Sequence, residues 1–95
     1  MATLTPEQVA SELASTPGWT VTDGALTRTV TGKDFRDSLL LVNAVGFLAE
    51  RAGHHPDILI SWNTVTLTLV THSEGGLTAA DFALAREITR LSSPG

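Results

Sequence analysis

Residues 58–71 read Ile58-Leu-Ile-Ser-Trp-Asn-Thr-Val-Thr-Leu-Thr-Leu-Val-Thr71, and this stretch forms the centre of the predicted sheet. It contains two runs of β-branched and apolar residues, 58–62 and 65–71, with only Asn63-Thr64 between them. Two residues are the commonest loop length of a β-hairpin, although the favoured Asn-Gly pair is absent. The stretch therefore predicts two antiparallel strands joined by a tight turn.

The three histidines of the chain flank this hairpin, with His54 and His55 before it and His72 after it. A turn centred on Asn63-Thr64 sets a register in which His55 comes out opposite His72. Directly opposed residues of an antiparallel pair have Cβ atoms about 5 Å apart. We therefore expect His55 and His72 to be neighbours, with His54 alongside.

The N-terminal segment carries several signals of a helix start. Thr5 can cap the helix, Pro6 suits its first position, and Gln8 can complete a capping box. The helix should end before the Ser-Thr-Pro-Gly sequence at 15–18, which is typical of a turn.

An earlier hairpin is predicted from the short alternating segments 19–21 and 26–30, which surround a turn at 22–24. Trp19 opens this hairpin. Its large ring suits either an ordinary core position or an aromatic wall for a flat ligand, and both interpretations stay open at this point.

The longest helix is predicted over residues 34–52, with Gly53 as its left-handed C-cap. Its apolar residues cover more than one stripe, and a small domain cannot bury two sides of a helix by itself. We therefore expect a subunit interface on this helix. The side expected to face the sheet holds Phe35, Leu39, Val42 and Ala49, and the other side holds Leu40, Ala44 and Phe47.

The last helix is predicted from the same kind of N-terminal capping residues as the first. Thr78 can cap it, Asp81 falls at its third position, and Leu77 with Phe82 can form a hydrophobic staple. Helix capping is a sufficient explanation of Asp81. The whole order, helix, hairpin, helix, hairpin, helix, predicts one α+β domain over residues 1–95, a two-layer sandwich of a four-stranded antiparallel sheet with three helices on one face.

Composition excludes several classes of function. A net charge of −4 with only six scattered basic residues argues against nonspecific nucleic-acid binding. The absence of cysteine excludes disulfides, thiolate zinc sites, iron–sulfur clusters and cysteine nucleophiles. The sequence has neither a signal peptide nor an apolar run near the ~20 residues of a membrane span, so a soluble cytoplasmic protein is expected.

Histidine titrates near neutrality, so histidines gathered in one place indicate either a metal site or proton transfer. His54, His55, His72 and nearby carboxylates could ligate zinc or iron. However, the His-Glu-x-x-His spacing is missing, and adjacent side chains in extended backbone point to opposite faces. No Gly-x-Ser-x-Gly nucleophile elbow is present either. The pattern favours metal-free general acid–base catalysis on a small molecule.

Four sequence elements together resemble the pterin-4a-carbinolamine dehydratases. They are Glu50-x-x-x-His54-His55-Pro56-Asp57, the pair Trp62-Asn63, the pair Thr71-His72, and Gly76-Leu77-Thr78 through Asp81. The resemblance extends from Gly18 to Ala85, and the Glu-x3-His-His-Pro signature is specific.

The resemblance implies dehydration of 4a-hydroxytetrahydropterin to quinonoid dihydropterin, a step of pterin cofactor recycling and tetrahydrobiopterin metabolism. It also implies a homodimer or homotetramer, with no metal and no bound cofactor. The expected catalytic residues are His54, His55 and His72, and the expected substrate-binding residues are Glu50, Trp19, Pro56 and Thr71.

Within that reaction we expect His54 and His72 to transfer protons on opposite sides of the ring, with His55 mainly binding and orienting the substrate. Glu50 would hold a histidine tautomer or pair with the polar edge of the pterin. The alternative is a pterin-binding protein, or a dimerisation or assembly factor, that has no catalytic activity.

Overall fold

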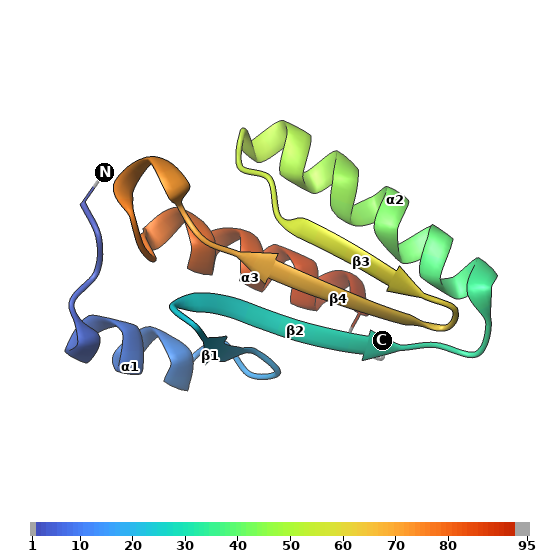
Figure 1. Ribbon diagram of the computed structural model, residues 1–95, viewed down its shortest axis with the longest axis horizontal. Coiled ribbons are helices and arrows are strands. Elements are labelled where there is room, and N and C mark those ends of the chain that lie inside the picture. The colour runs from blue at the N-terminus through green and yellow to red at the C-terminus, as the bar shows by residue number, and fades with distance from the viewer. Residues whose placement is uncertain (1, 93–95) are drawn as a thin grey trace.

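The computed structural model describes residues 2–92, and Figure 1 shows a four-stranded antiparallel sheet with helices packed on one side of it. The strands lie in the order β1-β2-β4-β3. The predicted α+β fold and its element order are confirmed. In chain order the elements are α1 (Pro6–Ala14), β1 (Thr20–Thr22), β2 (Ala25–Thr31), α2 (Phe35–Ala52), β3 (Asp57–Ser61), β4 (Thr64–Leu69), the 3-10 helix η1 (His72–Glu74) and α3 (Ala79–Ser92).

The helices begin and end where side chains satisfy their free backbone groups. Thr5 Oγ1 accepts from the Gln8 amide at 3.2 Å, and Gln8 Oε1 accepts from the Thr5 amide at 2.8 Å, which is the predicted capping box. Asp34 caps α2 by accepting from the Asp37 amide. Gly53 ends α2 in the left-handed region, with φ of 65°, as predicted. Each N-terminal cap of this kind contributes about 1 kcal/mol.

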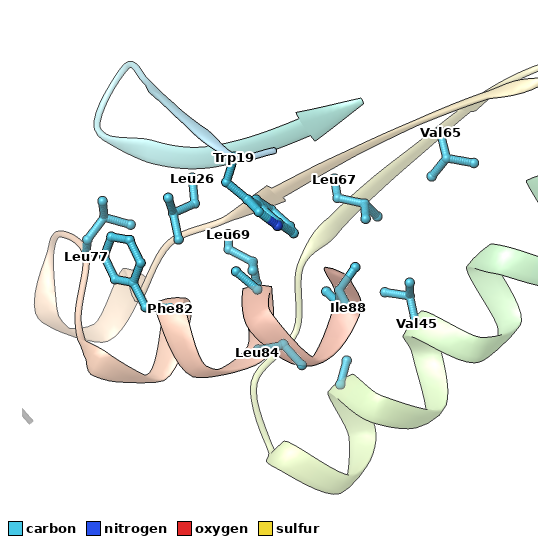
Figure 2. Packing of buried hydrophobic residues seen from close by; sticks show 12 residues of the cluster. Trp19, Leu26, Val45, Val65, Leu67, Leu69, Leu77, Phe82, Leu84 and Ile88 are labelled. Atoms are coloured by element: carbon cyan, nitrogen blue, oxygen red, sulfur yellow. The ribbon is translucent and has the colours of Figure 1, made fainter. Parts of the chain in front are cut away.

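The core lies between the sheet and helices α2 and α3, as Figure 2 shows. Strand β4 alternates strictly between the two faces: every second side chain is buried beneath the helices, and the threonines between them lie on the opposite face. Full burial of one large aliphatic or aromatic side chain contributes about 1.5–3 kcal/mol. The largest completely buried apolar side chains are Leu26, Val45, Val65, Leu67, Leu69, Phe82, Leu84 and Ile88.

The turn between β3 and β4 lies one residue earlier than predicted, so the predicted pairing of His55 with His72 is wrong. Trp62 and Asn63 form the loop, Ser61 pairs with Thr64, and the ladder ends where Asp57 pairs with Thr68. Trp62 takes a φ of 52°, a strained value for a bulky residue. The shift changes each cross-strand partner by two positions, and a two-residue shift keeps every side chain on its face.

Three hydrogen bonds hold this unexpected turn. The Ser38 hydroxyl donates to the Trp62 carbonyl at 2.6 Å, and the Asn63 amide donates to the Gly32 carbonyl at 3.1 Å. The Gly32 amide in turn donates to the Asn63 carbonyl at 2.8 Å. The turn is therefore set by contacts with α2 and with the end of β2, which the hairpin sequence alone does not contain.

The buried side of α2 is also rotated from its predicted position. Ser38, Val45 and Ala49 are buried, whereas Phe35 and Leu39, predicted to face the sheet, are 49% and 41% exposed. Ser38 takes the buried place because its hydroxyl has a partner in the β3–β4 turn. The second apolar side is exposed as expected, with Leu40 at 63% and Phe47 at 79%. Within residues 2–92, no helix has the length and apolar character needed to cross a membrane.

Candidate functional site

Asp81 is a completely buried carboxylate at the start of α3, and each of its oxygens has a different task. Oδ2 accepts from the backbone amide of Thr78 at 2.9 Å and from the hydroxyl of Thr71 at 2.8 Å. Oδ1 lies 2.5 Å from Nε2 of His54. A buried charge is tolerated only when hydrogen bonds compensate it, and these three contacts provide the compensation.

His54 reaches Asp81 because of the way α2 ends. Gly53 turns the chain in the left-handed region, and the His54 amide still donates to the Ala49 carbonyl at 3.1 Å. The His54 side chain is 16% exposed. A carboxylate can only accept a hydrogen bond, so Nε2 carries a proton in this pair. When the ring is neutral, Nδ1 is then the nitrogen without a proton.

Thr71 connects the segment of His72 to the same carboxylate. Its hydroxyl donates to Asp81 Oδ2 and is 2.8 Å from the Thr78 hydroxyl. His72 follows directly as the first residue of η1, and its side chain is exposed. The segments of His54 and His72 are thus joined through Asp81, and not through the predicted hairpin register.

His55 forms a second, more exposed pair. Its Nε2 lies 3.1 Å from Glu50 Oε1, and the two side chains are 62% and 74% exposed. Glu50 is in the last turn of α2, and half-buried Pro56 follows His55. His54 and His55 therefore have different carboxylate partners, and the role predicted for Glu50 in substrate binding stays a prediction.

A groove of about 390 Å³ adjoins the Glu50–His55 pair. Its wall is mostly apolar, and Glu50 is the charged side chain in it. A flat heterocycle with polar edges suits such a surface, because binding sites usually combine apolar walls with a few polar groups. The lining residues are Val42, Asn43, Gly46, Phe47, Glu50 and Ile58.

Trp19 has a structural place in this chain. Its side chain is 5% exposed within the core, and its indole N–H donates to the Thr89 hydroxyl at 2.9 Å. Figure 2 shows the ring between the sheet and α3. Of the two open interpretations, the structure supports the core position, so we correct the expectation that Trp19 contacts a ligand.

Asp81 is the residue that sequence reasoning undervalued. Helix capping was a sufficient explanation of Asp81 in the sequence, and in the structure Asp81 does accept a hydrogen bond from the Thr78 amide. Its contact with His54 spans 27 positions, and no periodic pattern indicates a pair at that distance. The available signal was its position at the end of the motif that begins at Gly76. In the part of the chain that the structure describes, no group of three or more possible metal-binding side chains was found.

Comparison with known proteins gives a consistent result over nearly the whole chain. A family model described as pterin 4 alpha carbinolamine dehydratase matches residues 2–91. A Nocardia farcinica protein is 51% identical over 89 residues, covering 94% of each chain. A Thermomicrobium roseum protein is 48% identical over 93 residues, covering 98% of this chain and all of the relative. Both carry the name pterin-4-alpha-carbinolamine dehydratase as a provisional assignment.

Solved structures agree with this fold. A crystal structure of a transcriptional coactivator/pterin dehydratase from Brucella melitensis superposes with a TM-score of 0.91 at 32% identity, covering 96% of this chain and 99% of that one. A pterin dehydratase-like protein identified as a RuBisCO assembly factor of the alpha-carboxysome superposes with a TM-score of 0.66. It covers 81% of this chain and 89% of that one at 20% identity, so this second likeness concerns the fold alone.

Proposed function

The chain belongs to the pterin 4 alpha carbinolamine dehydratase family, and from that premise we propose that it dehydrates 4a-hydroxytetrahydropterin to quinonoid dihydropterin. The observation that supports the proposal is the pair of His54 and buried Asp81, whose carboxylate also accepts from the hydroxyl of Thr71, the residue before His72. The proposed setting is pterin cofactor recycling in the cytoplasm.

The reaction needs two proton transfers. The bond between C4a and its hydroxyl oxygen breaks, a proton is delivered to the departing oxygen, and another leaves a ring nitrogen, so water is the second product. A near-neutral imidazole can perform either transfer, and each positioned group typically accelerates a reaction by about 10²–10⁴-fold. In our proposal His54 and His72 perform these transfers, one at each side of the ring.

Asp81 contributes by orienting His54. Its Oδ1 holds Nε2 of His54 in a hydrogen bond, and in our proposal Nδ1 is therefore the nitrogen that exchanges a proton with the substrate. Thr71 and the Thr78 amide hold Oδ2 and prevent the carboxylate from turning away. Asp81 is thus a positioning residue in this proposal, whereas His54 is a catalytic one.

The remaining predicted residues bind the substrate. Glu50 holds His55 and borders the apolar groove, so the two together can position the polar edge of a pterin. Pro56 restricts the backbone after His55, and Thr71 links the two histidine segments.

Measured decay of the 4a-carbinolamine tests this proposal. We expect His54→Ala and His72→Ala each to lower the enzymatic rate by at least about 100-fold while the fold is retained. Arg36→Ala is a suitable control, because Arg36 is an exposed residue near the other end of α2 and does not line the groove. Rates near wild type in both histidine variants would contradict the proposal, and loss of activity with a chelator would indicate a metal instead.

The alternative function is a pterin-binding or assembly factor that has no catalytic activity. The observation that favours it is the exposed apolar side of α2, where Phe47 is 79% exposed. A homodimer or homotetramer accounts for the same surface, and we include this assembly in the proposal. Purified protein that binds a pterin but does not accelerate carbinolamine decay would support the alternative.

A further inference from the structure

A small cavity lies where the end of α1 approaches the second half of α3, away from the histidines. Its volume is about 240 Å³. Arg86 and Arg90 are four residues apart on α3, so they lie on the same side of that helix. Two guanidinium groups therefore border one cavity. The full lining consists of Ser15, Thr16, Pro17, Arg86, Thr89 and Arg90.

A third arginine reaches the loop of residues 15–18, which borders this cavity, from the sheet. Arg28 of β2 pairs with Leu67, whose side chain is buried beneath the helices, so Arg28 also points to the helix side. A Cβ atom at Gly18 would lie 3.1 Å from Cζ of Arg28 and still closer to Nη1. Gly18 directly follows Pro17 of the cavity wall. Three of the six basic side chains of this acidic chain thus gather around one loop.

The positive charge in this cluster is only partly neutralised. Arg86 bonds to the Glu12 carboxylate and to the Ser15 hydroxyl, both through Nη2. Arg90 has no ion pair or hydrogen bond from its side chain to any residue in 2–92, and the buried Nε of Arg28 lacks a partner in the same range. Within residues 2–92 the structure pairs only Arg86 of these three arginines with a carboxylate, that of Glu12, so two of the three positive charges have no paired carboxylate there.

The guanidinium groups are also the hydrogen-bond donors that remain available there. The hydroxyls of Ser15 and Thr16 donate to the Glu12 carbonyl, and that of Thr89 donates to the Ala85 carbonyl. Helix α3 turns its carbonyl end toward this region, so its dipole does not attract an anion. Any anion held in the cavity must therefore depend on the arginine side chains.

We propose that this cluster, Arg28, Arg86 and Arg90, binds a phosphate group, either as inorganic phosphate or as the end of a small phosphomonoester. The planar guanidinium fork matches phosphate oxygens, and a dianion would balance the two excess charges. The cavity exceeds the volume of a few water molecules, each about 30 Å³, so it can hold the anion and part of an ester substituent.

Titration of ¹⁵N-labelled protein with sodium phosphate at constant ionic strength tests the proposal, with sodium chloride as the blank. We expect saturable amide shifts confined to residues 15, 16, 18 and 86–90. Arg90→Gln should weaken binding by about tenfold or more, because a hydrogen bond to a charged group is worth about 1.5–3 kcal/mol. Arg36→Gln is the matched control, since Arg36 is an exposed arginine of α2 outside the cluster.

Two further comparisons test the role of Arg28 and the kind of phosphate that binds. Arg28→Met keeps an apolar stem and removes the positive charge next to Gly18, so it should weaken phosphate binding without unfolding the protein. Phenyl phosphate binding more tightly than inorganic phosphate would assign the site to monoesters, and the reverse order would assign it to the free anion. Shifts that do not saturate, or equal weakening by Arg36→Gln and Arg90→Gln, would overturn the proposal. Carbinolamine decay is a separate readout, so the two proposals can fail independently.

Discussion

The two oxygens of Asp81 have different partners, and this division explains how one residue can both start a helix and orient a histidine. Oδ2 accepts hydrogen bonds from the Thr78 amide and the Thr71 hydroxyl, while Oδ1 is paired with Nε2 of His54. The carboxylate itself is removed from water, because Asp81 is completely buried. A substitution that keeps the shape of the side chain but changes one oxygen should therefore separate the two roles.

We expect Asp81→Asn to lower the dehydration rate by at least about tenfold, because loss of a group that orients a catalytic histidine typically has effects of this size. An amide nitrogen that faces Nε2 would favour the opposite tautomer of His54. The ¹⁵N chemical shifts of the His54 ring should report this change directly. Asp37→Asn is the control, since among residues 2–92 the Asp37 carboxylate accepts only from the Lys33 amide, near the other end of α2. An unchanged tautomer together with an unchanged rate would contradict the positioning role.

At the scale of elements, most of the fold could be predicted because its signals are local. The box of Thr5 and Gln8, the Asp34 cap and the Gly53 end each depend on residues within a few positions of one another. The β3–β4 turn was mispredicted because Ser38 and Gly32 hold it from outside the hairpin. The candidate site follows the same rule. The sequence indicated the histidines by their type, but Asp81, the partner of His54, lies 27 positions away along the chain.

The end of α2 gives a test of how an element positions a catalytic side chain. Gly53 has a φ of 65°, and no atom lies within 4 Å of a Cβ built there, so Gly53→Ala meets only a conformational penalty. We expect a loss of about 1–2 kcal/mol in the free energy of unfolding. The dehydration rate should also fall, because His54 follows the turn.

Gly46→Ala in the interior of the same helix is the matched control. Gly46 also has open space around a built Cβ, but its φ is not positive. We expect this variant to stabilise the protein by about 0.5–1 kcal/mol, since alanine is the better helix former. Chemical denaturation measures both variants. Equal effects of the two substitutions would show that the left-handed turn is not what Gly53 provides.

At the scale of the whole molecule, the helix layer covers one face of the sheet but leaves an apolar strip of its own exposed. Leu40 and Phe47 of α2 are 63% and 79% exposed, and they lie seven residues apart on one side of the helix. Seven residues are close to two helical turns, so two copies of α2 could pack along this strip. The strip also adjoins the groove next to Glu50, which places the proposed assembly beside the proposed site.

Phe47→Glu tests whether this strip holds subunits together. A charge at the centre of an apolar contact loses its hydration on association, so we expect the variant to be monomeric where the wild-type protein is dimeric or tetrameric. Light scattering after size exclusion measures the change. Thr29→Glu adds the same charge to the helix-free face of the sheet and should leave the assembly intact, because Thr29 pairs with Thr66 on that face. If the wild-type protein stays monomeric at high concentration, the proposed subunit interface is wrong. The apolar surface of α2 would then need another explanation than self-association.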